Sequence, residues 1–160
     1  MATKGSRDRP ITVRRILLPV DFSAASLQAA SFALARQLGC AVRCTTVVDV
    51  FDLRIAMRAG LHDFETNADL RRQVLRWIDG ELDKLTAIAG MRVQREVRRG
   101  IPEQEILESV RRYKPDLIVM GSIGMARRFP LGSRTRFVMG HTAVPVLVIR
   151  PAAVTSDPSD

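Results

Sequence analysis

A glycine-bearing loop near the end of the chain carries the residue types that bind anions. Gly121, Gly124 and Gly132 lie in this loop, and Ser133 follows directly. Glycines permit positive φ angles and let main-chain N–H groups approach an anion closely. We expect Ser133 to be the N-cap of a helix, whose first turn adds free N–H groups and the positive end of a dipole. The segment therefore predicts a phosphate site.

Arginines flank this loop on both sides. Residues 125–136 contain Arg127, Arg128, Arg134 and Arg136 and no acid. Arg127 either contacts a phosphate or lies with Arg128 at a solvated loop tip. The loop lacks the Gly-Lys-Ser/Thr ending of a P-loop, which excludes that class of NTPase.

An aspartate follows the first apolar run of the chain. Residues 15–20 are typical of a buried parallel strand, and Asp21 comes directly after them. In doubly wound folds an acidic residue binds a ribose hydroxyl, although Asp21 also suits a turn at a strand-to-helix corner. We expect Asp21 to be the only carboxylate near the loop. We therefore assign no catalytic residue, and we expect any ATP hydrolysis to be slow.

Alternating strands and helices must position these residues. Apolar runs predict strands at residues 15–20, 116–120 and 144–149, and β-branched residues predict one at 41–50. Alternation of apolar and polar residues predicts an edge strand at 91–97. Amphipathic periodicity predicts helices at residues 23–38, 70–90, 101–113 and 133–140, while residues 51–67 are interpreted as loop with some helix. The pattern favours an α/β fold: an open five-stranded parallel sheet in the order 3-2-1-4-5, with helices on both faces. Pro19, Val20 and Asp21 then meet the Gly121 loop where strands 1 and 4 diverge, which is where such folds bind ligands.

Composition and charge limit the class of protein. A chain of 160 residues fits one domain, which we place at residues 14–151 between a basic N-terminal tail (1–13) and a loose C-terminal tail (152–160). The net charge is +8, and the first 15 residues carry five basic side chains and one acid. No apolar run approaches the ~18 residues of a membrane span. Cys40 and Cys44 form no disulfide framework, which favours a reduced, cytoplasmic location. No His or Cys cluster has metal-ligand spacing, so no metal site is assigned.

Six segments together resemble the universal stress protein family. They are Leu18–Ser23, Val47–Asp49, Gly100–Pro102, Asp116–Ser122, Leu131–Ser133 and Val144–Arg150. The resemblance covers roughly residues 14–151. It implies a Rossmann-like fold of the adenine nucleotide alpha hydrolase type and a homodimer formed through the strand at 144–149. In one branch of the family it also implies binding of ATP or a related adenine nucleotide, with or without Mg²⁺.

The resemblance also implies roles for single residues. Asp21 corresponds to the family's ribose-side aspartate, Val47 to an adenine contact, and Met120 to a further contact beside the first glycine. The nucleotide-binding branch has Gly, two residues, Gly, nine residues, Gly, then Ser or Thr. Here seven residues separate Gly124 from Gly132. Arg134 replaces a small apolar residue, and it either pairs with phosphate or blocks the pocket.

Three functions follow from these observations. The first is an adenine-nucleotide-binding regulatory protein of the stress response, which senses ATP, ADP or AMP and acts on a protein partner that the sequence does not identify. The second is a dimeric interaction module of the same fold that binds no nucleotide. The third, nucleic-acid binding through the basic segments, ranks last because these segments contain one aromatic residue, Phe129, for stacking.

Overall fold

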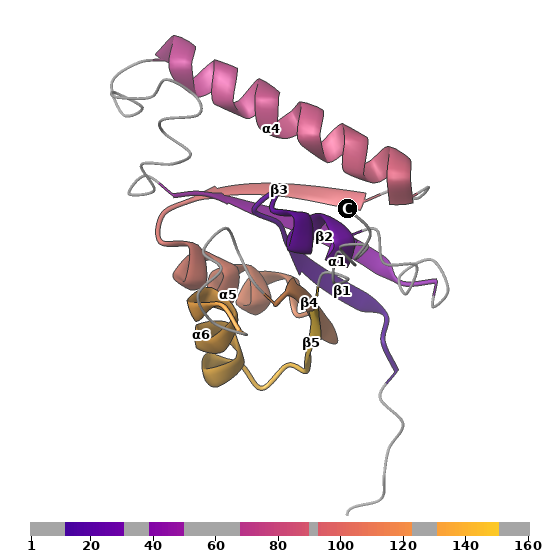
Figure 1. The fold of residues 1–160 in the computed structure, drawn as a ribbon. Coiled ribbons are helices and arrows are strands. Elements are labelled where there is room, and N and C mark those ends of the chain that lie inside the picture. The colour runs from indigo at the N-terminus through magenta and orange to yellow at the C-terminus, as the bar shows by residue number, and fades with distance from the viewer. Residues whose placement is uncertain (1–11, 31–38, 50–67, 90–92, 123–130, 151–160) are drawn as a thin grey trace, which may run out of the picture.

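Five parallel strands form one open sheet at the centre of the protein (Figure 1). The computed structural model describes residues 12–30, 39–49, 68–89, 93–122 and 131–150. The strands are β1 (Arg15–Pro19), β2 (Ala41–Val48), β3 (Val93–Arg99), β4 (Leu117–Gly121) and β5 (Val146–Ile149). They lie in the order β3-β2-β1-β4-β5, and every pairing is parallel. The strand order predicted from the sequence is therefore confirmed.

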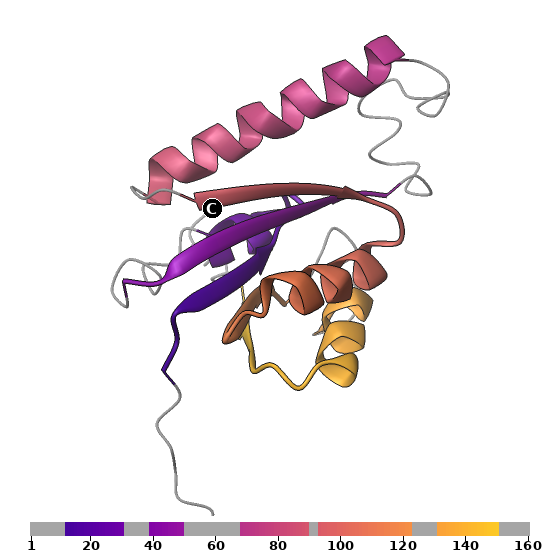
Figure 2. The same ribbon diagram turned by 180° about the vertical axis from the view of Figure 1, so that it is seen from behind.

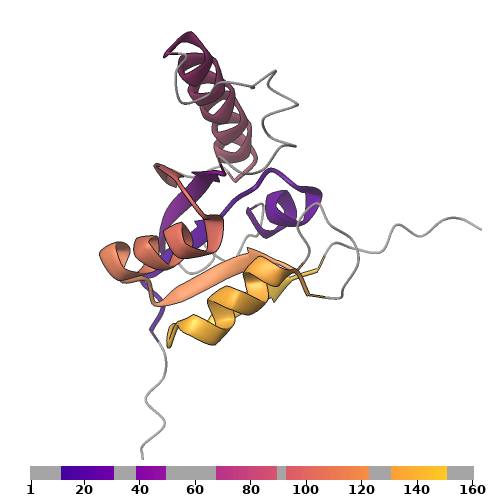
Figure 3. The same ribbon diagram turned by 90° about the vertical axis from the view of Figure 1, so that its left-hand side faces the viewer.

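Helices cover both faces of this sheet (Figures 2 and 3). The helices α1 (Ala24–Ala30) and α4 (Ala68–Ala89) pack on one face. The helices α5 (Pro102–Tyr113) and α6 (Ser133–His141) pack on the other. Of the helices that the structure describes, none is both long enough and apolar enough to cross a membrane.

The core has two parts because successive side chains of a strand point to opposite faces. On β1, Ile16 and Leu18 pack beneath α1 and α4, whereas Leu17 packs beneath α5 and α6. On β4, Val119 belongs to the first part and Ile118 to the second. Burying one such side chain contributes about 1.5–3 kcal/mol. Burial on both faces explains why these strands are continuous apolar runs in the sequence.

The boundaries of the described elements differ from the predicted ones by a residue or two, as is usual for helix and strand ends. Ser23 caps α1, since its Oγ accepts a hydrogen bond from the Ser26 N–H at 3.3 Å. Gly39 has a φ of +62°, a conformation that favours glycine. The predicted tails, the second half of the first helix and residues 51–67 lie outside the described residues.

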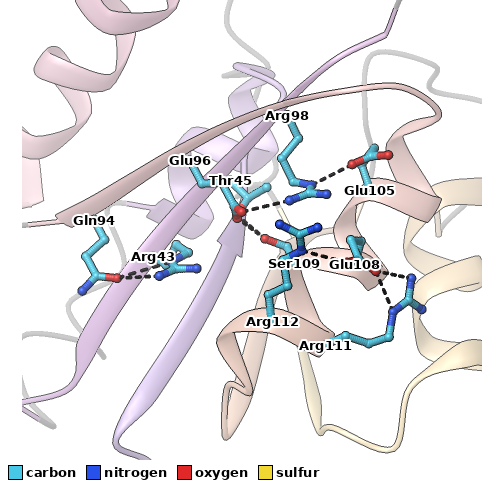
Figure 4. A network of polar contacts seen from close by, with 10 residues as sticks. All are labelled: Arg43, Thr45, Gln94, Glu96, Arg98, Glu105, Glu108, Ser109, Arg111 and Arg112. Atoms are coloured by element: carbon cyan, nitrogen blue, oxygen red, sulfur yellow. Dashed lines mark hydrogen bonds and ion pairs between the residues drawn. The ribbon is translucent and has the colours of Figure 1, made fainter.

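A polar network joins β2 and β3 to α5 (Figure 4). The carboxylate of Glu96 on β3 accepts hydrogen bonds from the hydroxyls of Thr45 on β2, at 2.9 Å, and of Ser109 on α5. Arg98 bridges Glu96 at 3.1 Å and Glu105 on α5 at 2.7 Å. Thr45 and Ser109 are buried, and the three charged side chains are largely covered. Mutual pairing thus satisfies groups that would be costly to bury alone.

The same contacts set the ionisation of Glu96. Burial by itself would raise its pKa, but hydrogen bonds from Ser109, Thr45 and Arg98 and the charge of Arg98 outweigh burial and hold the pKa below its ordinary value of 4.5. A carboxyl whose pKa is lower in the folded state stabilises the fold above its unfolded pKa. That stability is lost as the pH falls through the folded value.

Replacing Glu96 with Gln should lower the free energy of unfolding by about 1–3 kcal/mol at neutral pH, because the Gln side chain loses the charge that pairs with Arg98. As the pH falls below about 4.5, the wild type should lose stability, whereas the variant loses less, so their urea-unfolding free energies converge. The exposed carboxylate of Asp79 on α4 is the control. Asp79→Asn should change stability by no more than ~0.5 kcal/mol. Parallel pH curves for wild type and Glu96→Gln would contradict this role for Glu96.

Candidate functional site at the carboxyl end of the sheet

The carboxyl ends of β1 and β4 diverge at the centre of the sheet. The chain runs from β1 to α1 on one face, and α6, which follows β4, lies on the other. This is the topological switch point at which open α/β sheets bind ligands. Pro19 ends β1 and is followed by Val20 and Asp21, while Met120 and Gly121 end β4. The structure thus brings together the two groups of residues that the sequence placed there.

Asp21 lies at the corner between β1 and α1. It is half-buried, and its Oδ1 accepts a hydrogen bond from the Ser23 N–H at 3.0 Å. The next residue, Phe22, has a φ of +59°, a left-handed conformation that is uncommon for an aromatic residue and costs about 1–3 kcal/mol. The ring of Phe22 packs edge-on against Trp77 of α4, with 5.1 Å between centroids. The hydrogen bond from the Ser23 N–H orients the Asp21 carboxylate, and the contact with Trp77 holds the neighbouring Phe22 against α4.

Gly121 lies in close contact with the main chain of α1. A Cβ atom at this position would lie 2.9 Å from the main-chain carbon of Ala25 and 3.0 Å from the main-chain nitrogen of Ser26. The carbonyl of Gly121 also accepts a hydrogen bond from the Thr135 hydroxyl of α6 at 3.0 Å. Packing alone therefore requires glycine here, in addition to any role in binding an anion.

The N-terminus of α6 lies beside this point. The Gly132 N–H donates to the carbonyl of Ser122 at 2.7 Å, which closes the loop between β4 and α6. The predicted N-cap is wrong by one residue: Gly132 is the N-cap, and Ser133 is the exposed first residue of the helix. Because glycine has no side chain, no side-chain hydrogen bond caps α6. First-turn N–H groups have no acceptor within their own helix, so this terminus suits an anion.

Arg134 contacts a carboxylate that the sequence analysis did not place at the site. Its Nη2 donates to Oδ2 of Asp49 at 3.0 Å, and the two side chains are 35% and 13% exposed. Asp49 directly follows β2. The expectation that Asp21 is the only carboxylate near the loop is therefore wrong. The sequence could have indicated this carboxylate, because Asp49 lies at the carboxyl end of a predicted strand that lies beside β1.

Of the other predicted site residues, the structure describes Val20, Val47 and Met120. Val47 is half-buried on β2, whereas Val20 and Met120 are 4% and 5% exposed, so they offer a ligand mainly their main chain. Gly124 and Arg127 lie outside the described residues. Within the described ranges, no group of three or more His, Cys, Asp or Glu side chains is arranged to hold a metal ion. Both cysteines are buried and free.

An open parallel sheet with a site where strands 1 and 4 diverge defines a Rossmann-like α/β protein. The model of the Universal stress protein family matches residues 12–150. The chain belongs to the universal stress protein family, as the sequence resemblance predicted.

Individual relatives agree with this assignment. Universal stress protein MJ0531 of Methanocaldococcus jannaschii is 30% identical over 141 residues, which cover 86% of this chain and 82% of that protein. The structure of universal stress protein UspA from Lactobacillus plantarum has a TM-score of 0.67 and 25% identity, covering 86% of this chain and 98% of that one. A family protein of Arabidopsis thaliana with AMP bound has a TM-score of 0.58 and 18% identity, covering 92% and 99%.

Replacing Gly121 with Ala should lower the free energy of unfolding by about 1–3 kcal/mol, because the new methyl group meets the main chain of α1. Gly80 of α4 is the matched control, since a Cβ there meets no atom within 4 Å. Gly80→Ala should raise stability by up to about 1 kcal/mol, because alanine favours helix interiors. Urea unfolding of both variants measures these values, and a stability gain in Gly121→Ala would contradict the close contact.

Proposed function

We propose that this protein is a regulatory protein of the stress response that binds an adenine nucleotide, ATP, ADP or AMP, at the carboxyl end of the sheet. The observation that carries the proposal is the meeting of Asp21, the main chain at Gly121 and the N-terminus of α6 at the switch point. These groups offer an acceptor for ribose hydroxyls and donors for phosphate. Val47 would contact the base.

Structures with the same fold support the choice of ligand. AMP is bound in the Arabidopsis protein. A universal stress protein in complex with cAMP has a TM-score of 0.60 and 19% identity, covering 88% of this chain and 99% of that one. At these identities the likeness concerns the fold, and the nucleotides belong to those proteins. What extends nucleotide binding to this chain as a proposal is its own residues at the switch point, Asp21, Gly121 and the N-terminus of α6.

The proposed role is binding rather than hydrolysis. The two described carboxylates nearest the proposed phosphate site are already held as acceptors: Asp21 by the Ser23 N–H and Asp49 by Arg134. A carboxylate that acts as a general base must accept a proton from the attacking water, and these hydrogen bonds compete with that role. A cytoplasmic location, in which Cys40 and Cys44 stay reduced, fits this proposal.

Two substitutions test the proposed site by calorimetric titration of nucleotide-free protein with AMP and with ATP, with and without Mg²⁺. Gly132→Val should weaken binding because its branched side chain crowds the helix terminus. Asp21→Asn keeps an oxygen for the Ser23 N–H but removes the charge that accepts ribose hydroxyls. Each variant should lose about 10- to 100-fold in affinity, the equivalent of one hydrogen bond to a charged group.

The matched control for Gly132 is Gly140, at the other end of α6, where a Cβ meets no atom within 4 Å. Gly140→Val should bind nucleotide as the wild type does. If Gly132→Val and Asp21→Asn both keep full affinity, the site lies elsewhere. If the wild type binds no adenine nucleotide, the second function, a dimeric interaction module, replaces the first.

We propose in addition that the protein forms a homodimer through residues 144–149. Within the described part of the chain, β5 pairs with β4 along one edge, and each of its four residues is half-buried. Met139 on the neighbouring α6 is 45% exposed. An apolar edge strand of this kind favours pairing with another chain.

The register of β5 gives a selective test of this dimer. The carbonyls of Pro145 and Ile149 accept hydrogen bonds from β4 and from Ser122 directly after it, so Val148 has its N–H on the outer edge. Val148→Pro should therefore abolish the dimer while keeping the β4 pairing and the fold. Sedimentation measures the oligomeric state and circular dichroism measures the fold. The control is Ala143→Pro, in the exposed turn before β5, which should leave the dimer intact. A folded Val148→Pro dimer would contradict an interface along this edge.

A further inference from the structure

The ion pair between Asp49 and Arg134 crosses the carboxyl end of β1. Asp49 directly follows β2, and Arg134 is the second residue of α6, which follows β4. In the sheet, β1 lies between β2 and β4. The contact therefore joins elements on either side of the strand that leads to Asp21, although its two residues are 85 positions apart.

Both ends of this ion pair adjoin the proposed nucleotide site. Val47 lies two residues before Asp49 and packs against the part of the core beneath α5 and α6. Ser133, the first residue of α6, directly precedes Arg134. A nucleotide with its base at Val47 and its phosphate at the N-terminus of α6 would therefore lie beside both residues of the ion pair.

Carboxylates and phosphates bind a guanidinium group in the same way. Both present oxygens in a geometry that matches the N–H fork of arginine. The Asp49 and Arg134 side chains are 13% and 35% exposed, so water and salt screen this ion pair less than they would a fully exposed one. A phosphate that reaches Arg134 must therefore displace Asp49 or share the guanidinium with a second negative charge.

We propose that Asp49 is a specificity-determining residue that competes with the phosphate of the nucleotide for Arg134. This inference rests on the proposed function and concerns two side chains that lie 85 positions apart in the sequence and meet only in the fold. Asp49 lowers the affinity for phosphate-bearing ligands and leaves the affinity for the nucleoside unchanged. The protein therefore gains less from a phosphate group than the arginine alone would provide.

Calorimetric titrations with AMP and with adenosine separate these effects. Asp49→Asn keeps an oxygen that accepts from Arg134 but removes the competing charge. It should bind AMP about 5- to 100-fold more tightly than the wild type, the range of typical coupling between sites, and adenosine equally well. In an Arg134→Gln background the same substitution should have a much smaller effect on AMP.

A second carboxylate–arginine pair serves as the control. Asp83 on α4 pairs with Arg95 on β3, and neither residue lies at the carboxyl end of the sheet. Asp83→Asn should leave AMP affinity unchanged. Circular dichroism verifies the fold of each variant, and Asp49→Ala replaces Asp49→Asn if the latter does not fold.

The outcomes distinguish this inference from the proposed function. If the wild type binds AMP and neither Asp49 variant binds it more tightly, the competition is overturned and the nucleotide site stands. An equal gain for adenosine, or an equal gain without Arg134, also overturns it. Binding of AMP by Asp49→Asn but not by the wild type supports it strongly. If AMP does not bind to any form but ATP or ADP does, the same comparison is made with that nucleotide. If no form of the protein binds AMP, ADP or ATP, the proposed function and this inference fail together.

Discussion

The contact between α1 and Gly121 is the constraint on which the rest of the site depends. Main-chain atoms of Ala25 and Ser26 occupy the position that any side chain at residue 121 would need. The contact holds the start of α1 against the end of β4, so the β1–α1 corner with Asp21 lies beside the carboxyl end of β4. On the other face, the Thr135 hydroxyl ties α6 to the carbonyl of the same glycine. One residue without a side chain thus positions helices on both faces of the sheet.

The chemistry of the site follows from this placement. The N-terminus of α6 favours an anion, whereas Asp21 and Asp49 bring negative charge to the same edge of the sheet. These opposite preferences at one edge of the sheet suit a nucleotide, which has hydroxyl donors at one end and an anionic phosphate at the other. Arg134, at the start of α6, pairs with Asp49 at this edge. The balance of this ion pair with the ligand decides how strongly a phosphate contributes to binding.

Patterns that act over short distances allowed much of this fold to be predicted. The apolar runs predicted the strands because a sheet covered on both faces buries nearly every side chain of its inner strands. The order of the strands then brought Asp21 and Gly121 together. Contacts across long sequence separations were not predictable: neither residue of the Asp49–Arg134 pair reveals its partner, and the hydroxyls that hold Glu96 come from β2 and α5. The steric need for Gly121 likewise depends on where α1 lies.

The most direct test of the nucleotide site is to record main-chain amide chemical shifts by NMR during a titration with AMP. The structure predicts that the largest saturable changes occur at Asp21, at Gly121 and Ser122, and from Gly132 to Arg134, with smaller changes at Val47. These residues come from distant parts of the sequence and share only the carboxyl end of the sheet. Saturable changes confined to other surfaces, such as β3 and α4, or no changes at all, would contradict a nucleotide site at the switch point.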